Sequence, residues 1–235
     1  MLDFVTVTER LNKIKRMGYV KIHRTGNTGI GKTLEDLFGI DENNIAGPDA
    51  ENLELKSARK GAESMLTLFT KSPLPKNANS LILRTFGYPS DKNGKKKELH
   101  TTVNAVEYNT LKGKVGFKIG LRNDRIELVM ENGQVLGYWD NKTLQDKFEK
   151  KFPRLLYVKA DSRGRGKNEE FWFDEAWLLS DFSFKNFLRL LKEGTVLVDI
   201  RIGQYPDGRT HDHGTGFRVS PRRLERCFHT RERII

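Results

Sequence analysis

The sequence predicts an α/β fold in which a mixed sheet is flanked by helices and a second, smaller lobe is attached. Apolar residues recur with helical spacing in some segments and alternate as in strands in others, and both kinds are mixed along the 235 residues. No internal repeat or low-complexity linker separates them. Asn132-Gly133 between two apolar runs is a strong β-hairpin signal. The length suffices for one large domain or for two small lobes around a shared core.

The N-terminal third is expected to hold two helices and several strands. The first helix is predicted over residues 8–16, because apolar residues recur three apart and Gly18 can end it. A second, short helix follows the glycine-rich segment 26–31 and ends at Gly39. Strands are expected at residues 19–23, 53–57, 65–70 and 81–86.

The rest of the chain also mixes helices and strands. Ser183 is expected to cap a helix over residues 184–191, which Gly194 ends. A short helix near Phe148 must end before Pro153. Strands are expected at residues 126–130, 135–139, 155–160, 195–202 and 217–220, a basic turn at 92–97, a flexible basic loop at 162–167, and a final basic helix or turn from Pro221.

The composition limits the possible function classes. The net charge of +11 favours a polyanionic partner, because lysines and arginines release counterions when they neutralise phosphates. A soluble protein that is merely basic is the alternative. No apolar run approaches the roughly 20 residues that span a bilayer, and the N-terminus lacks a secretory signal, so no membrane association is expected. The single cysteine, Cys227, allows no internal disulfide and fits a cytoplasmic protein.

The segment Pro48-Asp49-Ala-Glu-Asn-Leu-Glu54-Leu-Lys56 indicates chemistry most clearly. Glu54 and Lys56 lie two apart on a predicted strand, so their side chains share a face, and Asp49 can fold back beside them. Carboxylates are hard ligands suited to Mg²⁺, with Mn²⁺ as a substitute, and an adjacent lysine can stabilise developing negative charge. Glu35, on the preceding helix, can add a carboxylate. The alternative is a solvent-facing strand with ordinary charges.

Several stretches of the chain are informative together. They are Gly26-Asn-Thr-Gly-Ile-Gly-Lys-Thr-Leu-Glu35, Pro48-Asp49, Glu54-Leu-Lys56, Leu66-Thr-Leu-Phe-Thr-Lys-Ser-Pro73, Val198-Asp-Ile-Arg-Ile-Gly203 and Thr210-His-Asp-His-Gly-Thr-Gly-Phe-Arg218. In this order they resemble the MvaI/BcnI family of type II restriction endonucleases, relatives of the mismatch-repair nicking enzyme MutH. The resemblance spans nearly the whole chain and is weakest over residues 90–180.

The resemblance implies the PD-(D/E)XK nuclease fold, with a catalytic lobe over residues 1–95 and a recognition lobe over 96–235, some of whose strands return to the core. It implies Mg²⁺-dependent cleavage of double-stranded DNA by a monomer, and a cognate DNA methyltransferase encoded alongside. The target is expected to be a short C/G-rich site of the form CC-N-GG, with CCWGG favoured. The residues that match the family's active-site positions are Glu35, Asp49, Glu54 and Lys56, the three carboxylates being the metal ligands.

The resemblance also indicates DNA contacts. Arginine pairs with guanine edges and aspartate accepts from the cytosine amino group, so Asp199, Arg201 and Arg218 are candidate base readers. The resemblance also makes His211-Asp212-His213 a DNA-contacting loop, with His211 and His213 as further candidate base readers. As a metal pair, the two histidines have no evident third ligand. Lys71 is expected to touch a phosphate near the cut. The expected DNA-binding residues are Asn27, Lys32, Thr70, Lys71, Asp199, Arg201, His211, Asp212, His213 and Arg218.

Three alternatives stay open. One is a MutH-like nickase that a partner activates at hemimethylated sites, and another is a DNA-binding module without catalysis. The third is a nucleotide hydrolase, because Gly26-x₄-Gly31-Lys32-Thr33 satisfies the P-loop pattern and an apolar strand ends at Asp199. Against the third, the strand before the loop is short and polar, so no nucleotide cofactor is expected.

Overall fold

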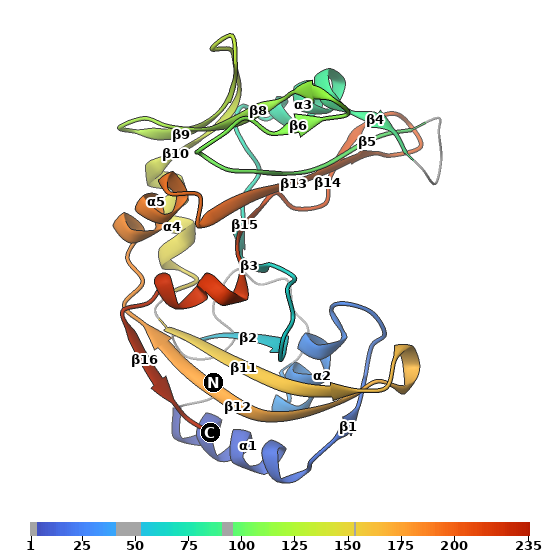
Figure 1. Ribbon diagram of the computed structural model, residues 1–235, viewed down its shortest axis with the longest axis vertical. Coiled ribbons are helices and arrows are strands. Elements are labelled where there is room, and N and C mark those ends of the chain that lie inside the picture. Colours follow the sequence, from blue (N-terminus) through green and yellow to red (C-terminus); the bar gives the residue numbers. More distant parts are fainter. Residues whose placement is uncertain (1–3, 41–52, 91–95, 153) are drawn as a thin grey trace. The chain divides into compact units, whose positions relative to one another are not determined.

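The computed structural model describes residues 4–40, 53–90, 96–152 and 154–235, and the chain divides into two compact units. The units do not divide at residue 95, because strand β2 (Glu54–Arg59) pairs with strand β11 (Arg154–Arg163) inside one of them (Figure 1). Unit 1 contains Met1–Glu63, Glu149–Phe182 and Glu225–Ile235, and unit 2 contains Ser64–Phe148 and Ser183–Leu224.

Unit 1 is built on a mixed five-stranded sheet with the strand order β1-β12-β11-β2, in which β16 also pairs with β12. Strand β11 runs antiparallel to β12 and parallel to β2, and Tyr157 stands opposite Lys56 in this register. The other elements of the unit are α1 (Phe4–Arg16), β1 (Val20–Lys21), α2 (Gly29–Phe38), the 3₁₀ turn η1 (Gly166–Asn168), β12 (Glu170–Ser180) and β16 (Thr230–Arg233).

Helices α1 and α2 pack on one face of this sheet (Figure 1). Leu11 of α1 and Leu34 of α2 are fully buried in one apolar cluster with Val158 of β11 and Phe171 of β12. Burial of this apolar surface is the main force that holds the unit together. Because strand residues alternate between faces, Tyr157 lies on the opposite face, away from the helices.

The described part of unit 2 contains three antiparallel sheets. The largest has the strand order β3-β15-β13-β5-β4, with β14 also paired to β13, the second has the order β10-β9-β8, and the third is the two-stranded pair β6-β7. The elements are β3 (Leu66–Thr70), α3 (Ala78–Phe86), β4 (Tyr88–Pro89), β5 (Lys97–Val103), β6 (Thr110–Leu111), β7 (Lys114–Val115), β8 (Phe117–Leu121), β9 (Arg125–Met130), β10 (Val135–Asp140), α4 (Asn141–Glu149), α5 (Phe184–Lys192), β13 (Val196–Gln204), β14 (Thr210–Asp212) and β15 (Gly216–Val219); η2 (Pro221–Arg226) leads back to unit 1.

Aromatic rings join the elements of unit 2. Phe217 of β15 stacks on Phe69 of β3 with ring centroids 4.8 Å apart, and Phe187 of α5 packs against both rings. Trp139 of β10 meets Phe217 edge-on at 5.5 Å. Its indole N–H donates to the backbone carbonyl of Lys71 at 2.8 Å. This contact fixes the backbone of Lys71, an expected DNA contact, in the segment that follows β3.

Most of the expected helices and the hairpin are confirmed. Helix α1 ends at Arg16, and α2 ends before Gly39, whose φ of 64° is the left-handed conformation of a helix stop. The Ser183 hydroxyl accepts the Asn186 N–H at the start of α5. Strands β9 and β10 pair across a turn in which Gly133 has a φ of 84°. Helix α4 also lies where it was expected.

The strand predicted at residues 81–86 is wrong, because these residues are the second half of helix α3. Ala78, Ile82 and Leu83 are its buried residues, which is a helical spacing that begins before the apolar run Leu81-Ile-Leu83. A three-residue apolar run fits a buried strand or a helix face equally well. The periodicity that distinguishes them depends on Ala78, a residue too small to mark an apolar stripe.

Other elements differ in extent. The strand expected at residues 19–23 shortens to β1, and the strand expected at 155–160 extends to Arg163, so only part of the basic segment 162–167 is loop. Within the basic segment 92–97, only residues 96 and 97 are described, and Lys97 begins β5. Strands β5, β8 and β12 are not among the expected elements.

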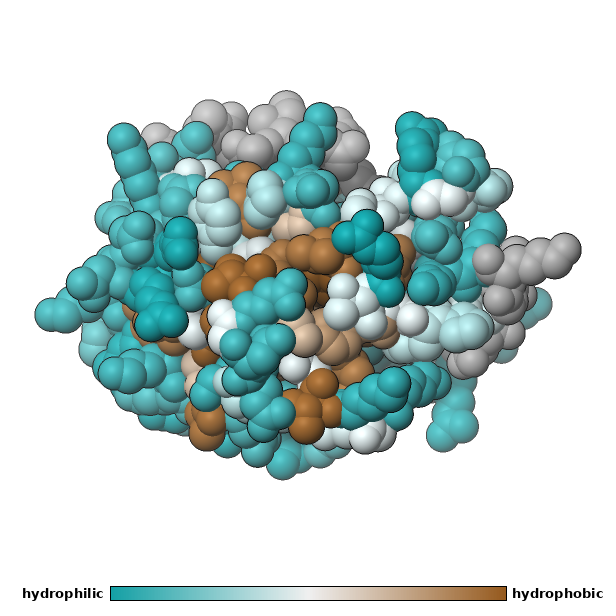
Figure 2. Space-filling view, turned by 90° about the horizontal axis from the view of Figure 1, so that it is seen from above, coloured by the Kyte–Doolittle hydropathy of each residue, from teal (hydrophilic) through white to brown (hydrophobic). Residues whose placement is uncertain are grey.

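The surface is largely hydrophilic. Figure 2 shows a face on which apolar residues form a central patch bordered by hydrophilic ones. The large apolar side chains exposed in unit 2 include Val106, Val115 and Val135. Among the described residues, no helix is long and apolar enough to cross a membrane.

Candidate active site and nucleic-acid interface

Glu54 begins strand β2 and is buried, with a relative exposure of 2%. Lys56, two residues further along the strand, places its Nζ 2.7 Å from Glu54 Oε1. This proximity follows from the strand itself, because residues i and i+2 share a face. A buried carboxylate needs a partner of opposite charge, and Lys56 supplies one while its own side chain remains 32% exposed.

A second lysine completes the environment of Glu54. Lys151, which follows helix α4, donates from Nζ to Glu54 Oε2 at 2.9 Å. Each carboxylate oxygen of Glu54 therefore faces an ammonium group. Such charge-assisted hydrogen bonds are shorter and stronger than neutral ones, so the carboxylate is held in one orientation.

Glu35 lies near the same strand but on the side of α2. Glu35, Lys56 and Ser57 line one open pocket of about 330 Å³, together with Asn27 and Lys32. A Cβ added at Gly31 would lie 3.9 Å from both Glu35 Oε1 and Ser57 Oγ, so the glycine leaves room between these two oxygens. The pocket joins Glu35 to Lys56, as expected, but Glu54 is not among the residues that line it.

The oxygen donors near this end of β2 are of the kind that bind a divalent cation. Glu54 and Glu35 supply hard carboxylate oxygens. The Ser57 hydroxyl, on the other face of β2 from Glu54, is buried without a hydrogen-bond partner in the described part of the chain. Asp49, the third expected ligand, lies outside the described residues, as does Pro48. Among the residues that are described, no cluster of three acidic, histidine or cysteine side chains is placed to hold a metal.

The glycine-rich segment does not have the properties of a P-loop. The Thr33 hydroxyl is buried and accepts the His23 N–H at 3.0 Å while donating to the Gly29 carbonyl at 2.8 Å, so it is not available to a nucleotide-bound metal. Lys32 pairs with Asp36 at 2.8 Å. The strand before the segment, β1, has only two residues, in contrast to the buried central strand that precedes a P-loop.

In unit 2, Asp199 organises two arginines. Its Oδ2 accepts from Arg201 Nε at 2.7 Å and lies 3.0 Å from a terminal nitrogen of Arg218, while Oδ1 accepts from the Thr102 hydroxyl at 3.0 Å. Asp199 is 5% exposed, so it serves mainly to hold the arginines. Burial lowers the pKa of Arg218, and the carboxylate of Asp199 opposes this shift.

The two histidines and Asp212 have different surroundings. The rings of His211 and His213 meet edge-on at 4.2 Å, and Tyr205 packs on His211 at 4.5 Å. Partial burial lowers the pKa of His213, and His211 lowers it further, so His213 is neutral near pH 7. Asp212 Oδ2 instead accepts from Ser72 Oγ at 2.5 Å and from Asn79 Nδ2 at 2.8 Å. The Asp212 side chain is therefore hydrogen-bonded within unit 2, and its contacts differ from those of the His211 and His213 rings.

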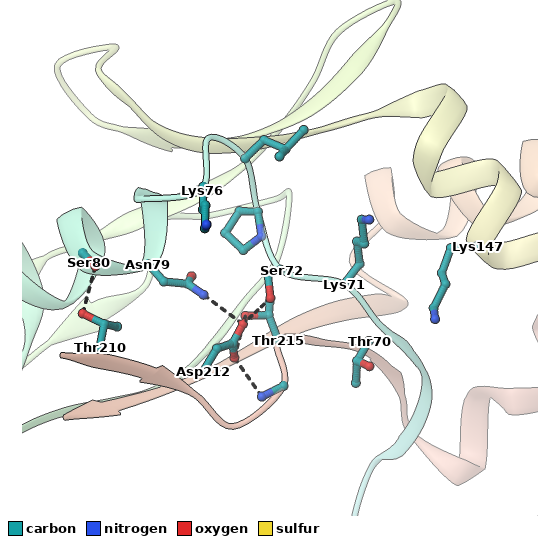
Figure 3. Close-up of a pocket in the computed structure, with 13 residues that line it drawn as sticks. Thr70, Lys71, Ser72, Lys76, Asn79, Ser80, Lys147, Thr210, Asp212 and Thr215 are labelled. Carbon is teal, nitrogen blue, oxygen red and sulfur yellow. Dashed lines mark hydrogen bonds between the residues drawn. The ribbon is translucent and has the colours of Figure 1, made fainter. Parts of the chain in front are cut away.

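Asp212 also lines a pocket of about 640 Å³ (Figure 3). Lys71, Lys76 and Lys147 line it, as does Thr70. None of the three ammonium groups forms an ion pair with a described residue. Three positive charges around one open pocket, none of them held in an ion pair within the described chain, favour an anionic ligand.

Sequence reasoning missed Lys151, Lys76 and Lys147. Lys151 lies 97 positions from Glu54, so no spacing in the sequence connects them. Lys147 and Lys151 belong to a basic stretch after Leu144 that looks like an ordinary solvated helix end. The only signal was the excess of positive charge, which does not single out individual residues.

The mixed sheet, the buried carboxylate between ammonium groups and the arginine-rich second unit are features of a DNA-cleaving hydrolase. The protein is a type II site-specific deoxyribonuclease. It belongs to the MvaI/BcnI restriction endonuclease family, whose family model matches residues 8–228. Enzymes of this class generally use divalent metal ions. The predicted family is therefore confirmed.

Two solved structures are similar over the full length. One, described as a restriction endonuclease MvaI-cognate DNA substrate complex, is 30% identical with a TM-score of 0.85, and the match covers 100% of both chains. The other, restriction endonuclease MvaI in the absence of DNA, is 29% identical with a TM-score of 0.60, covering 100% of this chain and 99% of that one. These matches confirm the restriction-endonuclease-like α/β fold. No curated protein sequence matches significantly.

Proposed function

We propose that the chain cleaves both strands of duplex DNA at a short specific site with Mg²⁺, using Glu35, Asp49, Glu54 and Lys56 as its PD-(D/E)XK active site. The observation that supports this most directly is the buried Glu54 carboxylate with Lys56 Nζ 2.7 Å away on the same strand. Nearby, Glu35 and Lys56 line one pocket. The solved MvaI complex with its cognate DNA substrate supports duplex DNA as the ligand.

The roles of the residues follow from their chemistry. Glu54 and Glu35, with Asp49, would hold the divalent cation, which supplies Lewis-acid polarisation of the phosphodiester and an acidified attacking water. Lys56 lies beside this site without being a ligand. Its ammonium group stabilises negative charge that develops as the phosphate is attacked, and this effect is largest in the transition state.

Recognition is proposed to reside in unit 2, where Arg201 and Arg218 read guanine edges. Because Asp199 Oδ2 already holds both arginines, Asp199 fixes their direction and leaves the reading of the bases to them. His211 and His213 contact bases in the same groove. Asp212, which lies between the two histidines at the end of β14, holds this segment through Ser72 and Asn79. A C/G-rich site of the CC-N-GG type, with CCWGG favoured, suits these arginines.

Backbone contacts are proposed for the lysines of the larger pocket. Lys71, Lys76 and Lys147 have no ion-pair partner among the described residues, so they gain favourable interactions when phosphates approach. Thr70 joins them from the pocket wall. In unit 1, Asn27 and Lys32 line the smaller pocket beside Lys56 and are proposed to contact the strand that is cut. The enzyme is proposed to act as a monomer beside a cognate methyltransferase.

The test separates chemistry from binding. Lys56→Ala should lower cleavage of a plasmid by at least about 10²-fold while gel-shift affinity for the same site stays near wild type. Lys13→Ala, which removes an exposed charge on α1, is the matched control and should cut normally. If Lys56→Ala cuts at the wild-type rate, the active site is elsewhere.

Two further measurements distinguish the alternatives. The protein alone, with Mg²⁺ or Mn²⁺ and without nucleotide, should linearise unmethylated plasmid, whereas a nickase that needs a partner would leave it intact or relaxed. Loss of a nucleotide-dependent activity in Lys32→Ala would support the P-loop alternative. Sequencing the ends of fragments from digested phage DNA identifies the target, which we expect to contain CC and GG around a central A/T pair.

A further inference from the structure

The second lysine at Glu54 is not part of the PD-(D/E)XK pattern. Lys151 Nζ lies 2.9 Å from Glu54 Oε2, and Lys56 Nζ lies 2.7 Å from Glu54 Oε1. With Glu54 only 2% exposed, each carboxylate oxygen is covered by one ammonium group. One negative charge therefore stands between two positive charges.

The position of Lys151 is fixed by its neighbour in the chain. Phe152 is buried, and its ring packs edge-on against Phe182 at 5.7 Å and against Phe228 at 6.5 Å. The backbone at Lys151 is thus anchored in the core of unit 1 independently of its charge. The side chain, by contrast, is 22% exposed, so its ammonium group has a route to solvent.

A divalent cation at Glu54 would compete with this arrangement. The cation needs a carboxylate oxygen, each oxygen already pairs with one ammonium group, and the two nearby positive charges repel the cation. Lys56 is tied to the site by the strand that it shares with Glu54. Lys151 approaches from another part of the chain and is the group that can withdraw.

We propose that Lys151 is a positioning residue that occupies Glu54 Oε2 in the metal-free enzyme and must leave this oxygen before a divalent cation binds there. The proposal rests on the proposed function, because it assumes that Glu54 is a metal ligand. It makes Lys151 an internal competitor of the metal. The residue keeps the buried carboxylate compensated when no metal is present and sets the metal concentration that the enzyme needs.

The test measures Mn²⁺ binding to the full-length, DNA-free protein, by the loss of the free-ion signal in electron paramagnetic resonance. Lys151→Met keeps the apolar stem and removes the charge, and it should bind Mn²⁺ about tenfold more tightly than wild type or better. Lys150→Met changes the net charge equally at an exposed neighbouring position and should bind as wild type does. Lys151→Gln serves as the second variant if the methionine variant does not fold.

The outcomes separate the two claims. If Lys151→Met binds Mn²⁺ no more tightly than Lys150→Met, the competition does not exist, and this result leaves the proposed roles of the metal and of Glu54 in cleavage untouched. If Glu54→Gln binds Mn²⁺ as well as wild type, Glu54 is no ligand, and the proposed active site and this inference both fail. Tighter binding by Lys151→Met that is abolished by adding Glu54→Gln supports both.

Discussion

Arg218 illustrates how a buried acid can prepare a basic side chain for recognition. Its guanidinium lies 3.0 Å from Asp199, and its side chain is only 18% exposed. A restrained side chain loses less conformational entropy on binding than a free one. The direction of the guanidinium is therefore set before DNA arrives, which suits a residue that must distinguish one base edge from another.

Replacement of Arg218 tests this role directly. Arg218→Ala should weaken binding of the specific site by about 1–3 kcal/mol and relax the preference for it over random DNA. Arg209→Ala removes a highly exposed arginine of the same unit and should leave that preference intact. Competition gel shifts with specific and random duplexes give both values. An unchanged preference in Arg218→Ala would remove it from the set of base readers.

Gly31 offers a second test at the scale of a residue. A methyl group there would add to the wall of the pocket that Gly31 lines, at ordinary van der Waals distance (3.9 Å) from Glu35 Oε1 and from Ser57 Oγ. Alanine also favours the helix by about 0.5–1 kcal/mol over glycine. We therefore expect Gly31→Ala to raise the urea midpoint and to lower the rate of cleavage. Equal cleavage rates in the two proteins would show that the pocket between Glu35 and Lys56 takes no part in the reaction.

Residue spacing predicted only the local part of the candidate site. Glu54 and Lys56 could be paired from the sequence, because two positions on one strand share a face whatever the fold. Lys151 could not, because only the tertiary fold brings it to Glu54. Asp212 was grouped with its histidine neighbours, although alternation along β14 gives it different contacts.

At the scale of elements, the strand β12 shows why a strong strand can escape detection. The β12 residues buried in the apolar cluster with α1 and α2 are Phe171, Phe173, Ala176 and Leu178, so the spacing of two is interrupted by a spacing of three. The interruption coincides with a β-bulge in the pairing of β12 with β11, where the register shifts between Lys159 and Ala160 of β11. A bulge shifts the alternation of buried and exposed residues by one position. The apolar alternation that identifies a strand in the sequence is then broken, although the strand itself continues.

Helix α5 provides a prediction about stability. Ser183 caps it by accepting the Asn186 N–H at 3.1 Å, and Phe187, Leu190 and Leu191 bury its inner face. Ser183→Ala should lower the free energy of unfolding by about 1 kcal/mol, because one N–H at the helix start loses its acceptor. Urea denaturation measures the change. Ser183→Asp restores an acceptor and should recover most of the loss; if it does not, the cap contributes little.

At the scale of the whole molecule, charge should govern affinity for DNA of any sequence. The triple variant Lys71→Ala, Lys76→Ala and Lys147→Ala removes three lysines around one pocket that form no ion pair with any described residue. We expect the slope of log affinity against log salt concentration to become shallower by roughly 0.9 for each phosphate that is no longer neutralised, hence by about 2–3 in total. Fluorescence anisotropy with a random duplex at several salt concentrations measures this slope.

The control for that experiment uses exposed lysines of the same unit. Lys142→Ala, Lys185→Ala and Lys192→Ala together change the net charge by the same amount. Their effect on the slope should be clearly smaller. An equal effect would mean that general positive charge, and not the pocket, accounts for the binding of phosphates.

The fold class could be predicted from mixed helical and strand patterns, but the path of the chain could not. The prediction placed a boundary at residue 95, whereas unit 1 is assembled from three segments and unit 2 from two. Pairing between strands that are distant in the sequence leaves no local sequence pattern, because the apolar alternation of a strand is the same whichever strand it pairs with.

The pairing of β2 has a consequence during synthesis. Its ladder partner, β11, begins at Arg154, so the ribosome adds about 100 residues after Glu54 before the strand can enter a sheet. At 5–20 residues per second this takes roughly 5–20 s. Throughout that interval the segment with Glu54 and Lys56 lacks its neighbouring strand β11. Lys151 is also absent for most of the interval, because it is synthesised only three residues before Arg154. A nascent or prematurely terminated chain that lacks β11 therefore carries Glu54 and Lys56 without the neighbouring strand that holds them in the sheet.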